Sequence, residues 1–126
     1  INENQILHNS LTREDGLNAI KSILKTKERP DAIFCANDTT ALSAIIHLKE
    51  RGIKVPEDIA IVGFSNEPFS ELVTPSISTI KQPGFEMGQK AAELLIKQIG
   101  SKTKPKAYET IMMETELIVR NSSQRK

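Results

Sequence analysis

The amino-acid sequence predicts an α/β domain built on a mainly parallel sheet. Three helical candidates alternate with short apolar runs that have the length of strands. Unbroken apolar runs of this kind fit strands that are covered on both faces, as in a parallel sheet between two layers of helices. The chain of 126 residues has the size of one ordinary domain. We therefore expect a single three-layer α/β/α unit.

Helical spacing of apolar residues defines the three helical candidates. Residues 13–25 carry one apolar stripe, and Thr12 followed by Asp15 resembles a capping box. Residues 38–51 hold more apolar positions than one narrow stripe, which predicts a helix with two buried faces. Residues 84–99 form the third stripe, which Gly100 ends.

The strand candidates lie between and after these helices. Residues 32–36 and 59–64 are the clearest, because each is a short, unbroken apolar run. Weaker candidates are residues 78–81, 108–113 and 117–120. The polar tail, residues 121–126, is expected to fray.

Composition and charge narrow the class of protein. The formal net charge is +1, so charge alone indicates neither a nucleic-acid nor a membrane partner. No apolar stretch approaches the length of a membrane span. The single cysteine, Cys35, lies in an apolar run, which favours a buried thiol and agrees with a reducing, cytoplasmic setting.

Residues that could carry catalysis or bind a metal are not grouped in the sequence. His8 and His47 are far apart, and Cys35 has no evident base nearby. There is no Cys/His cluster for zinc and no glycine-rich phosphate loop. We therefore expect no catalytic residues, no metal and no cofactor.

Two polar segments follow the two clearest strands directly. Asn37 and Asp38 come after the first, and Ser65 and Asn66 come after the second. In open α/β sheets, ligands bind at the carboxyl ends of the strands. Amide, hydroxyl and carboxylate groups suit a small polar molecule such as a sugar or a nucleoside. The same residue types are also favoured helix N-caps, so the pattern alone leaves both roles open.

Four segments, in order, resemble the LacI/GalR family of transcription regulators. They are residues 35–42, 52–64, 74–83 and 114–123, of which the second reads GIKVPEDIAIVGF. The resemblance implies the C-terminal subdomain, in truncated form, of a type I periplasmic-binding-protein-like core. Residues 1–126 would be one α/β fragment of that core. Residues 82–100 would pack on an N-terminal subdomain that the fragment lacks.

The same resemblance implies an effector-sensing module and not an enzyme. In this family a small effector is clamped between two subdomains, and a separate helix-turn-helix headpiece binds operator DNA. These residues hold no headpiece, so we expect no operator binding by them alone and no membrane partner. The effector-contacting positions carried over from the family are Leu11, Asn37, Ser65 and Gln82.

Two of these positions depart from the family pattern. Leu11 stands where many members have an aromatic residue, and Ser65 stands where many have an aspartate. Losing the carboxylate removes the charge-assisted hydrogen bonds expected for a simple sugar. Ser65 with Asn66 would suit a different or larger effector.

The helix predicted at residues 38–51 also predicts a homodimer. Its sheet-facing positions are expected to be Leu42, Ile45 and Ile46. Its other apolar positions, expected to face solvent, are Ala41, Ala44 and Leu48. A monomer rarely leaves such a patch open. The resemblance places this helix and the segment with Pro68 and Leu72 at a two-fold interface. The alternative is that residues 13–25 cover this face within the chain.

Two other functions stay open. A solute-binding protein of a transport system has the same fold, and a secretory signal upstream would favour it. An α/β enzyme is the third possibility, since a fold does not fix a function. The absence of a nucleophile–base or metal pattern argues against the enzyme.

Overall fold

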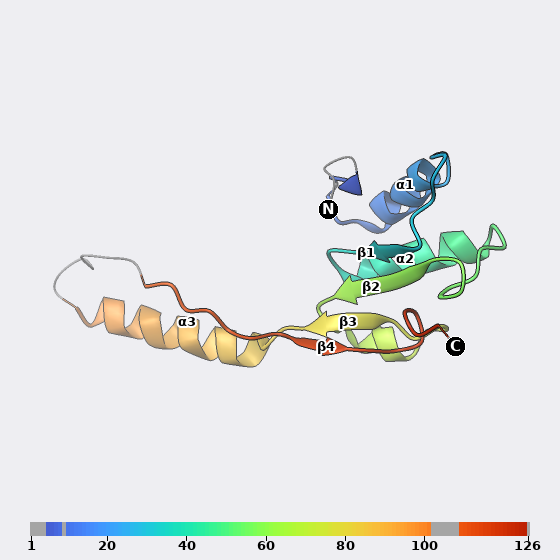
Figure 1. Ribbon diagram of the computed structural model, residues 1–126. Coiled ribbons are helices and arrows are strands. Elements are labelled where there is room, and N and C mark those ends of the chain that lie inside the picture. The colour runs from blue at the N-terminus through green and yellow to red at the C-terminus, as the bar shows by residue number, and fades with distance from the viewer. Residues whose placement is uncertain (1–4, 9, 102–108, 126) are drawn as a thin grey trace. The chain divides into compact units, whose positions relative to one another are not determined.

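The computed structural model describes residues 5–8, 10–101 and 109–125 (Figure 1). The elements in chain order are α1 (Arg13–Ile23), β1 (Ala32–Phe34), α2 (Asp38–Lys49), β2 (Ala60–Phe64), the 3-10 helix η2 (Pro68–Glu71), β3 (Ser78–Lys81), α3 (Gly84–Ile99) and β4 (Glu116–Ile118). The described residues up to Lys81 and from Leu117 onward form one compact unit. Those from Gln82 to Glu116 form a second unit.

The sheet has the order β1-β2-β3-β4. β1 is parallel to β2, with Phe34 opposite Val62, and β2 is parallel to β3, with Gly63 opposite Thr79. β4 lies beside β3 and runs in the opposite direction (Figure 1). The predicted α/β class with a mainly parallel sheet is confirmed.

The core of the first unit lies between the sheet and the two helices α1 and α2. Its fully buried apolar side chains come from both helices and from the sheet region, and they include Ile20, Ile45, Leu48, Ile59, Ile61 and Ile77. Burying one such side chain contributes about 1.5–3 kcal/mol relative to leaving it in water. α1 packs on α2 at Gly16, where a side chain would meet Ser43 and the backbone of Thr40.

The prediction that one face of α2 is left open was wrong. Ala41, Ala44 and Leu48 are 0%, 2% and 0% exposed in the single chain. Ala41 faces the sheet, since its Cβ lies within 3.3 Å of the position that a Cβ on Gly63 would take. The cover is intramolecular, which was the alternative, because α1 packs on α2 and Ser43 Oγ donates to the carbonyl of Arg13 at 2.6 Å. These three residues are therefore not available to a second chain.

The prediction that the strands are buried on both faces also needs correction. α2 covers the sheet face that carries Ile61 and Gly63. On the opposite face Phe34 is 63% exposed, and its ring meets that of Phe64 edge-on at 6.4 Å. No helix among the described residues of this unit covers that face. Within this unit the apolar runs are therefore covered on one face only, because an apolar run alone does not reveal which face has a partner.

Residues 121–125 of the C-terminal tail are held by hydrogen bonds, contrary to the prediction that the tail frays. Ser122 is fully buried, and its Oγ donates to the carbonyl of Ile61 at 2.6 Å and accepts from the amide of Ser78 at 2.8 Å. Arg125 Nε donates to the carbonyl of Pro56 at 3.0 Å. These polar side chains bind backbone groups of the sheet and its loops, so the tail belongs to the fold.

The second unit contains α3, whose bounds agree with the predicted helix at residues 84–99. None of its residues is buried, and Phe85, Ile96 and Ile99 are among its exposed apolar side chains. Residues 109–113 form no strand, contrary to the prediction, and residue 108 lies outside the described residues. Across the described part of the chain, no helix combines the length and the apolar character that a membrane span requires.

Candidate ligand site at the carboxyl ends of the strands

Asn37 caps α2 and also holds the segment that precedes α1. Its Oδ1 accepts from the amide of Thr40 at 2.7 Å, which satisfies one of the free amides at the helix start. Its Nδ2 donates to the carbonyl of Leu11 at 2.9 Å. Leu11 has a positive φ of 63° and an exposed side chain. The structure thus brings together two candidate residues that are far apart in the sequence.

Ser65 and Asn66 form a turn directly after β2 with a backbone that side chains disfavour. Their φ angles are 109° and 55°, both in the region that favours glycine. The amide of Ser65 donates to the carbonyl of Ile80 at 2.9 Å, and the amide of Asn66 donates to Thr79 Oγ1 at 3.2 Å. Strained non-glycine residues of this kind gather at functional sites, where the surrounding structure holds them.

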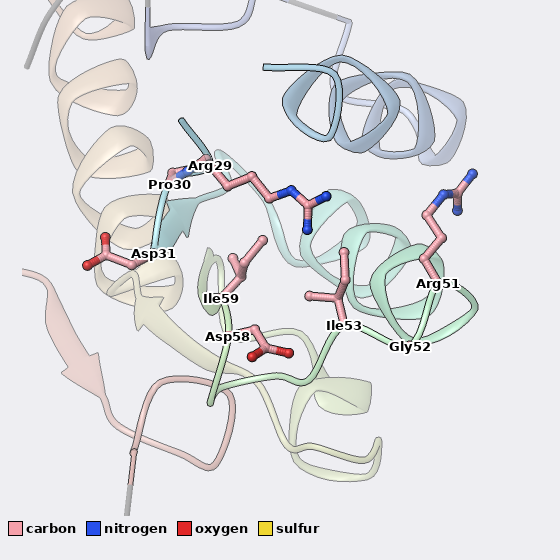
Figure 2. A pocket seen from close by; sticks show the side chains of 8 residues that line it. All are labelled: Arg29, Pro30, Asp31, Arg51, Gly52, Ile53, Asp58 and Ile59. Atoms are coloured by element: carbon pink, nitrogen blue, oxygen red, sulfur yellow. The ribbon is translucent and has the colours of Figure 1, made fainter. Parts of the chain in front are cut away.

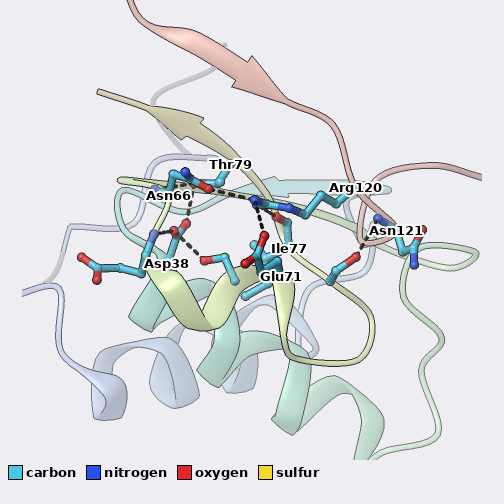
Figure 3. A network of polar contacts seen from close by, with 10 residues as sticks. Asp38, Asn66, Glu71, Ile77, Thr79, Arg120 and Asn121 are labelled. Atoms are coloured by element: carbon cyan, nitrogen blue, oxygen red, sulfur yellow. Dashed lines mark hydrogen bonds and ion pairs between the residues drawn. The ribbon is translucent and has the colours of Figure 1, made fainter. Parts of the chain in front are cut away.

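Asp38, which the sequence predicts as a ligand-binding residue, is hydrogen-bonded within the protein. Its side chain is fully buried, and both carboxylate oxygens are engaged (Figure 3). Oδ1 accepts from Thr79 Oγ1 at 2.7 Å. Oδ2 accepts from the amide of Glu67 and from Ser70 Oγ, each at 2.8 Å. Asp38 therefore links the start of α2 to Thr79, Glu67 and Ser70.

The two polar segments lie at one edge of the sheet. β1 and β2 are parallel neighbours, so the residues that follow them leave the sheet on the same side. The hydrogen bond from the Glu67 amide to Asp38 joins the start of α2 to the turn after β2. Gln82, the remaining candidate, begins the second unit, so its part in the same site stays a prediction.

The sequence reading missed Arg120, which secures the turn. Its Nη2 donates to Asn66 Oδ1 at 2.9 Å and its Nη1 donates to the carbonyl of Ile77 at 2.8 Å (Figure 3). Nη2 also lies 4.0 Å from Glu71 Oε2, an ion pair that adds little because Glu71 is well exposed. The only signal in the sequence was an arginine within a family-like closing segment, which does not indicate a contact across 54 residues.

No titratable group near the site is arranged as a nucleophile. Burial, followed by the negative charge of Asp38, raises the pKa of the Cys35 thiol to about 12. A thiol in that state is a poor nucleophile at neutral pH. His47 Nδ1 lies 2.9 Å from Glu50 Oε2, and this hydrogen bond lowers the pKa of Glu50. No group of three potential metal ligands occurs among the described residues.

A surface hollow lies at the other end of the strands. It measures about 440 Å³ and is lined by Arg29, Pro30, Asp31, Arg51, Gly52, Ile53, Asp58 and Ile59 (Figure 2). Pro30 and Asp31 precede β1 and Ile59 precedes β2, so the hollow is remote from the residues that follow these strands. Its charged side chains are of both signs, and Asp58 Oδ2 accepts from the amide of Lys54 at 2.7 Å. This mixture of charges does not favour one class of ligand over another.

Comparison with known proteins shows the family to which this chain belongs. The family described as a periplasmic binding protein-like domain matches residues 2–123. The chain belongs to that family. The predicted relationship to LacI-type regulators is confirmed by relatives within the family.

One relative is the HTH-type transcriptional repressor PurR of Vibrio campbellii, which is 34% identical over 97% of this chain and 36% of its own length. A LacI family transcriptional regulator from Enterococcus faecalis, solved with bound ribose, is 36% identical with a TM-score of 0.80, covering 93% of this chain and 42% of that one. The transcriptional regulator CelR in complex with cellobiose is 29% identical with a TM-score of 0.81, and the match covers 96% of this chain and 38% of the CelR chain. These relatives are regulators, which agrees with the prediction of a binding module and not an enzyme. The chain spans about a third of the length of the curated relatives it matches.

Proposed function

We propose that this chain is the effector-sensing part of a LacI-type transcription regulator that acts in the cytoplasm. A small polar effector binds where β1 and β2 end, against Leu11, Asn37, Ser65 and Asn66, while the role of Gln82 stays a prediction from the sequence. The observation that carries the proposal is the meeting of two polar segments at one sheet edge, where Ser65, Asn66 and the Asn37-bound Leu11 all have positive φ angles. The family membership supports the same site.

The Asn37 side chain at this edge has hydrogen-bonding capacity beyond the two bonds that it makes within the protein. An amide side chain offers two acceptor lone pairs and two N–H donors, and the Thr40 and Leu11 bonds account for one of each at Asn37. The Ser65 hydroxyl both donates and accepts, as a sugar hydroxyl requires of its partner. The exposed side chain of Leu11 supplies an apolar contact for the C–H face of a ring. Relatives solved with ribose and with cellobiose make sugars the first class to test.

Effector binding would be coupled to operator affinity through a change in population. A ligand that binds one arrangement of the two subdomains more tightly shifts the protein toward it, in proportion to the difference in affinity. Operator DNA would be bound by a headpiece and not by these residues. No cofactor takes part.

A homodimer is the second part of the proposal, now on a smaller surface than the sequence suggested. Pro68 and Leu72 remain available, and Leu72 is 78% exposed at the end of η2. Lys49 Nζ donates to the carbonyl of Thr74 at 3.0 Å, so the end of α2 adjoins the segment after η2. An isologous contact around Leu72 would remove this large apolar side chain from water.

Calorimetric titration of the full-length protein with ribose, cellobiose and a panel of nucleosides tests the proposal. We expect one of them to bind, and Ser65→Ala to weaken that binding by about 1–3 kcal/mol, which is roughly 5- to 150-fold. The effector should also change the protein's affinity for its operator in a gel shift. Binding of a solute without any binding of DNA would favour the transport protein. Unchanged affinity in both Ser65→Ala and Asn37→Ala would place the site elsewhere.

A further inference from the structure

We propose that Asp38 and Thr79 are positioning residues for the effector site, which fix the Ser65–Asn66 turn through a relay of hydrogen bonds. The inference rests on the proposed function, because it concerns the same site. Neither residue touches the ligand. Their action is to hold two ligand-facing residues in a backbone conformation that these residues would otherwise leave.

The relay runs from the buried carboxylate to the turn. The Thr79 hydroxyl donates its hydrogen to Asp38 Oδ1 at 2.7 Å, so its oxygen accepts the amide hydrogen of Asn66 at 3.2 Å. A hydroxyl has one hydrogen, so the carboxylate fixes the direction of both bonds. Thr79 can therefore accept from the turn because Asp38 takes its hydrogen.

The second carboxylate oxygen holds the other side of the turn. Asp38 Oδ2 accepts from the amide of Glu67 and from Ser70 Oγ, each at 2.8 Å. Two consecutive amides, those of Asn66 and Glu67, are thus tied to one carboxylate, the first through Thr79 and the second directly (Figure 3). Asp38, Ser70 and Thr79 are fully buried, and hydrogen bonds strengthen where water is excluded.

The turn needs such support because of its backbone. Ser65 and Asn66 have φ angles of 109° and 55°, which residues with a Cβ rarely adopt in succession. Without the relay, the amide of Asn66 would lose its partner and the turn would be free to relax toward negative φ. The side chains of Ser65 and Asn66 would then leave the sheet edge at which they face the ligand.

The relay also joins the two halves of the site. Asp38 directly follows Asn37, whose side chain caps α2 and holds Leu11. A shift of the Asp38 carboxylate would therefore displace both the Asn37 segment and the Ser65–Asn66 turn. Space for the carboxylate exists because residue 63 is glycine, as a Cβ there would clash with Asp38 Oδ1.

A matched set of hydroxyl variants in the full-length protein tests the relay. Thr79→Val keeps the shape of the side chain but removes both bonds, whereas Thr79→Ser keeps the hydroxyl. Ser122→Ala is the control, because it deletes another fully buried hydroxyl that bridges two backbone groups, Ile61 and Ser78, nearer the start of the strands. Amide hydrogen exchange of residues 65–67 and calorimetric titration with ribose and cellobiose are the two readouts.

We expect Thr79→Val to speed exchange at residues 65–67 at least tenfold relative to the amides of β2, and to weaken sugar binding at least tenfold. Thr79→Ser should resemble the wild type in both readouts. Ser122→Ala should lower the melting temperature yet leave the exchange of the turn and the sugar affinity unchanged. Should Thr79→Val not fold, Ser70→Ala removes one donor to Asp38 and should speed exchange at Glu67.

Exchange of the turn that stays at the wild-type rate in the Thr79 and Ser70 variants would overturn the relay. Equal effects of Thr79→Val and Ser122→Ala on the turn would also overturn it, since they would indicate a general loss of stability. If the wild type binds neither sugar, the sugar class of effector is wrong. The exchange comparison still decides whether the relay holds the turn, so the two failures are distinguishable.

Discussion

The carboxylate of Asp38 occupies the space that a side chain on Gly63 would need. A Cβ built on Gly63 clashes with Asp38 Oδ1 and lies 3.3 Å from the Cβ of Ala41. The contact joins the first turn of α2 to β2, one residue before the end of that strand. The absence of one methyl group therefore allows a buried carboxylate to reach its donors at the site.

Gly63→Ala should lower the free energy of unfolding by about 1–3 kcal/mol, the usual effect of forcing an extra methyl group into a packed core. The carboxylate of Asp38 must move away from Thr79 and Glu67 to make room. Urea unfolding followed by circular dichroism measures the loss. Gly88→Ala is the control, because a Cβ there meets nothing within 4 Å and alanine favours a helix. Equal unfolding midpoints for Gly63→Ala and the wild type would contradict the packing described here.

Periodicity predicted most of the fold but not the partner of each face. The strand and helix positions followed from spacing, because burial dictates which residues of an element are apolar. α2 was correctly predicted to bury two faces, yet Leu48 was assigned to solvent. The helical wheel does not say whether its second partner is α1 or another molecule, and only the packing of α1 decides that.

The residues of the candidate site could also be predicted from the sequence only in part. Asn37 and Ser65 could be located, because polar residues directly after a buried strand fall at its carboxyl end. Asp38 could not be separated from Asn37 by the same rule, since neighbours along the chain point in different directions. The contacts of Thr79 and Arg120 link residues more than 40 positions apart, and no local pattern records them.

The two roles of Asn37 can be separated by a pair of substitutions. Asn37→Ala removes the cap of α2 and should reduce stability by about 0.5–2 kcal/mol. Asn37→Asp keeps an acceptor for the Thr40 amide but loses the donor to Leu11, so stability should be retained while Leu11 is released. Thermal unfolding measures the first effect and effector titration the second. If the two variants lose stability equally, Asn37 does not act as the cap.

The proposed homodimer depends on Leu72 and not on the buried face of α2. Leu72→Glu should convert the dimer to a monomer in sedimentation velocity, because it places a charge on an exposed apolar side chain at the two-fold contact. Leu117→Glu, at another exposed leucine of the same unit, should leave the dimer intact. Leu48→Glu should unfold the protein, since that side chain has no exposed surface. A dimer that survives Leu72→Glu would move the interface elsewhere.

The start of α1 should make stability depend on pH in the acid range. The backbone hydrogen bond from Thr12, followed by the Thr12 hydroxyl, lowers the pKa of Asp15 below its ordinary value of 3.8. A carboxyl whose pKa is lower in the folded state stabilises the fold above the unfolded value, and this contribution is lost as the pH falls through the folded value. The melting temperature of Asp15→Asn should therefore lie below that of the wild type at about pH 6 and converge with it below about pH 3. A gap of constant size across this range would contradict the role of the charge.

Cys35 should resist alkylation for as long as the protein is folded. Burial, with a further contribution from the negative charge of Asp38, raises the pKa of its thiol to about 12. At about pH 8 only roughly one thiol in ten thousand would then be the reactive thiolate. The side chain is also 6% exposed, so a reagent has little access to it. Iodoacetamide followed by mass spectrometry should therefore find the native protein unlabelled and the protein in concentrated urea fully labelled. Rapid labelling in the absence of urea would mean that the strand end at Cys35 opens readily, and the candidate site, which begins two residues later at Asn37, would then lack the rigid support described here.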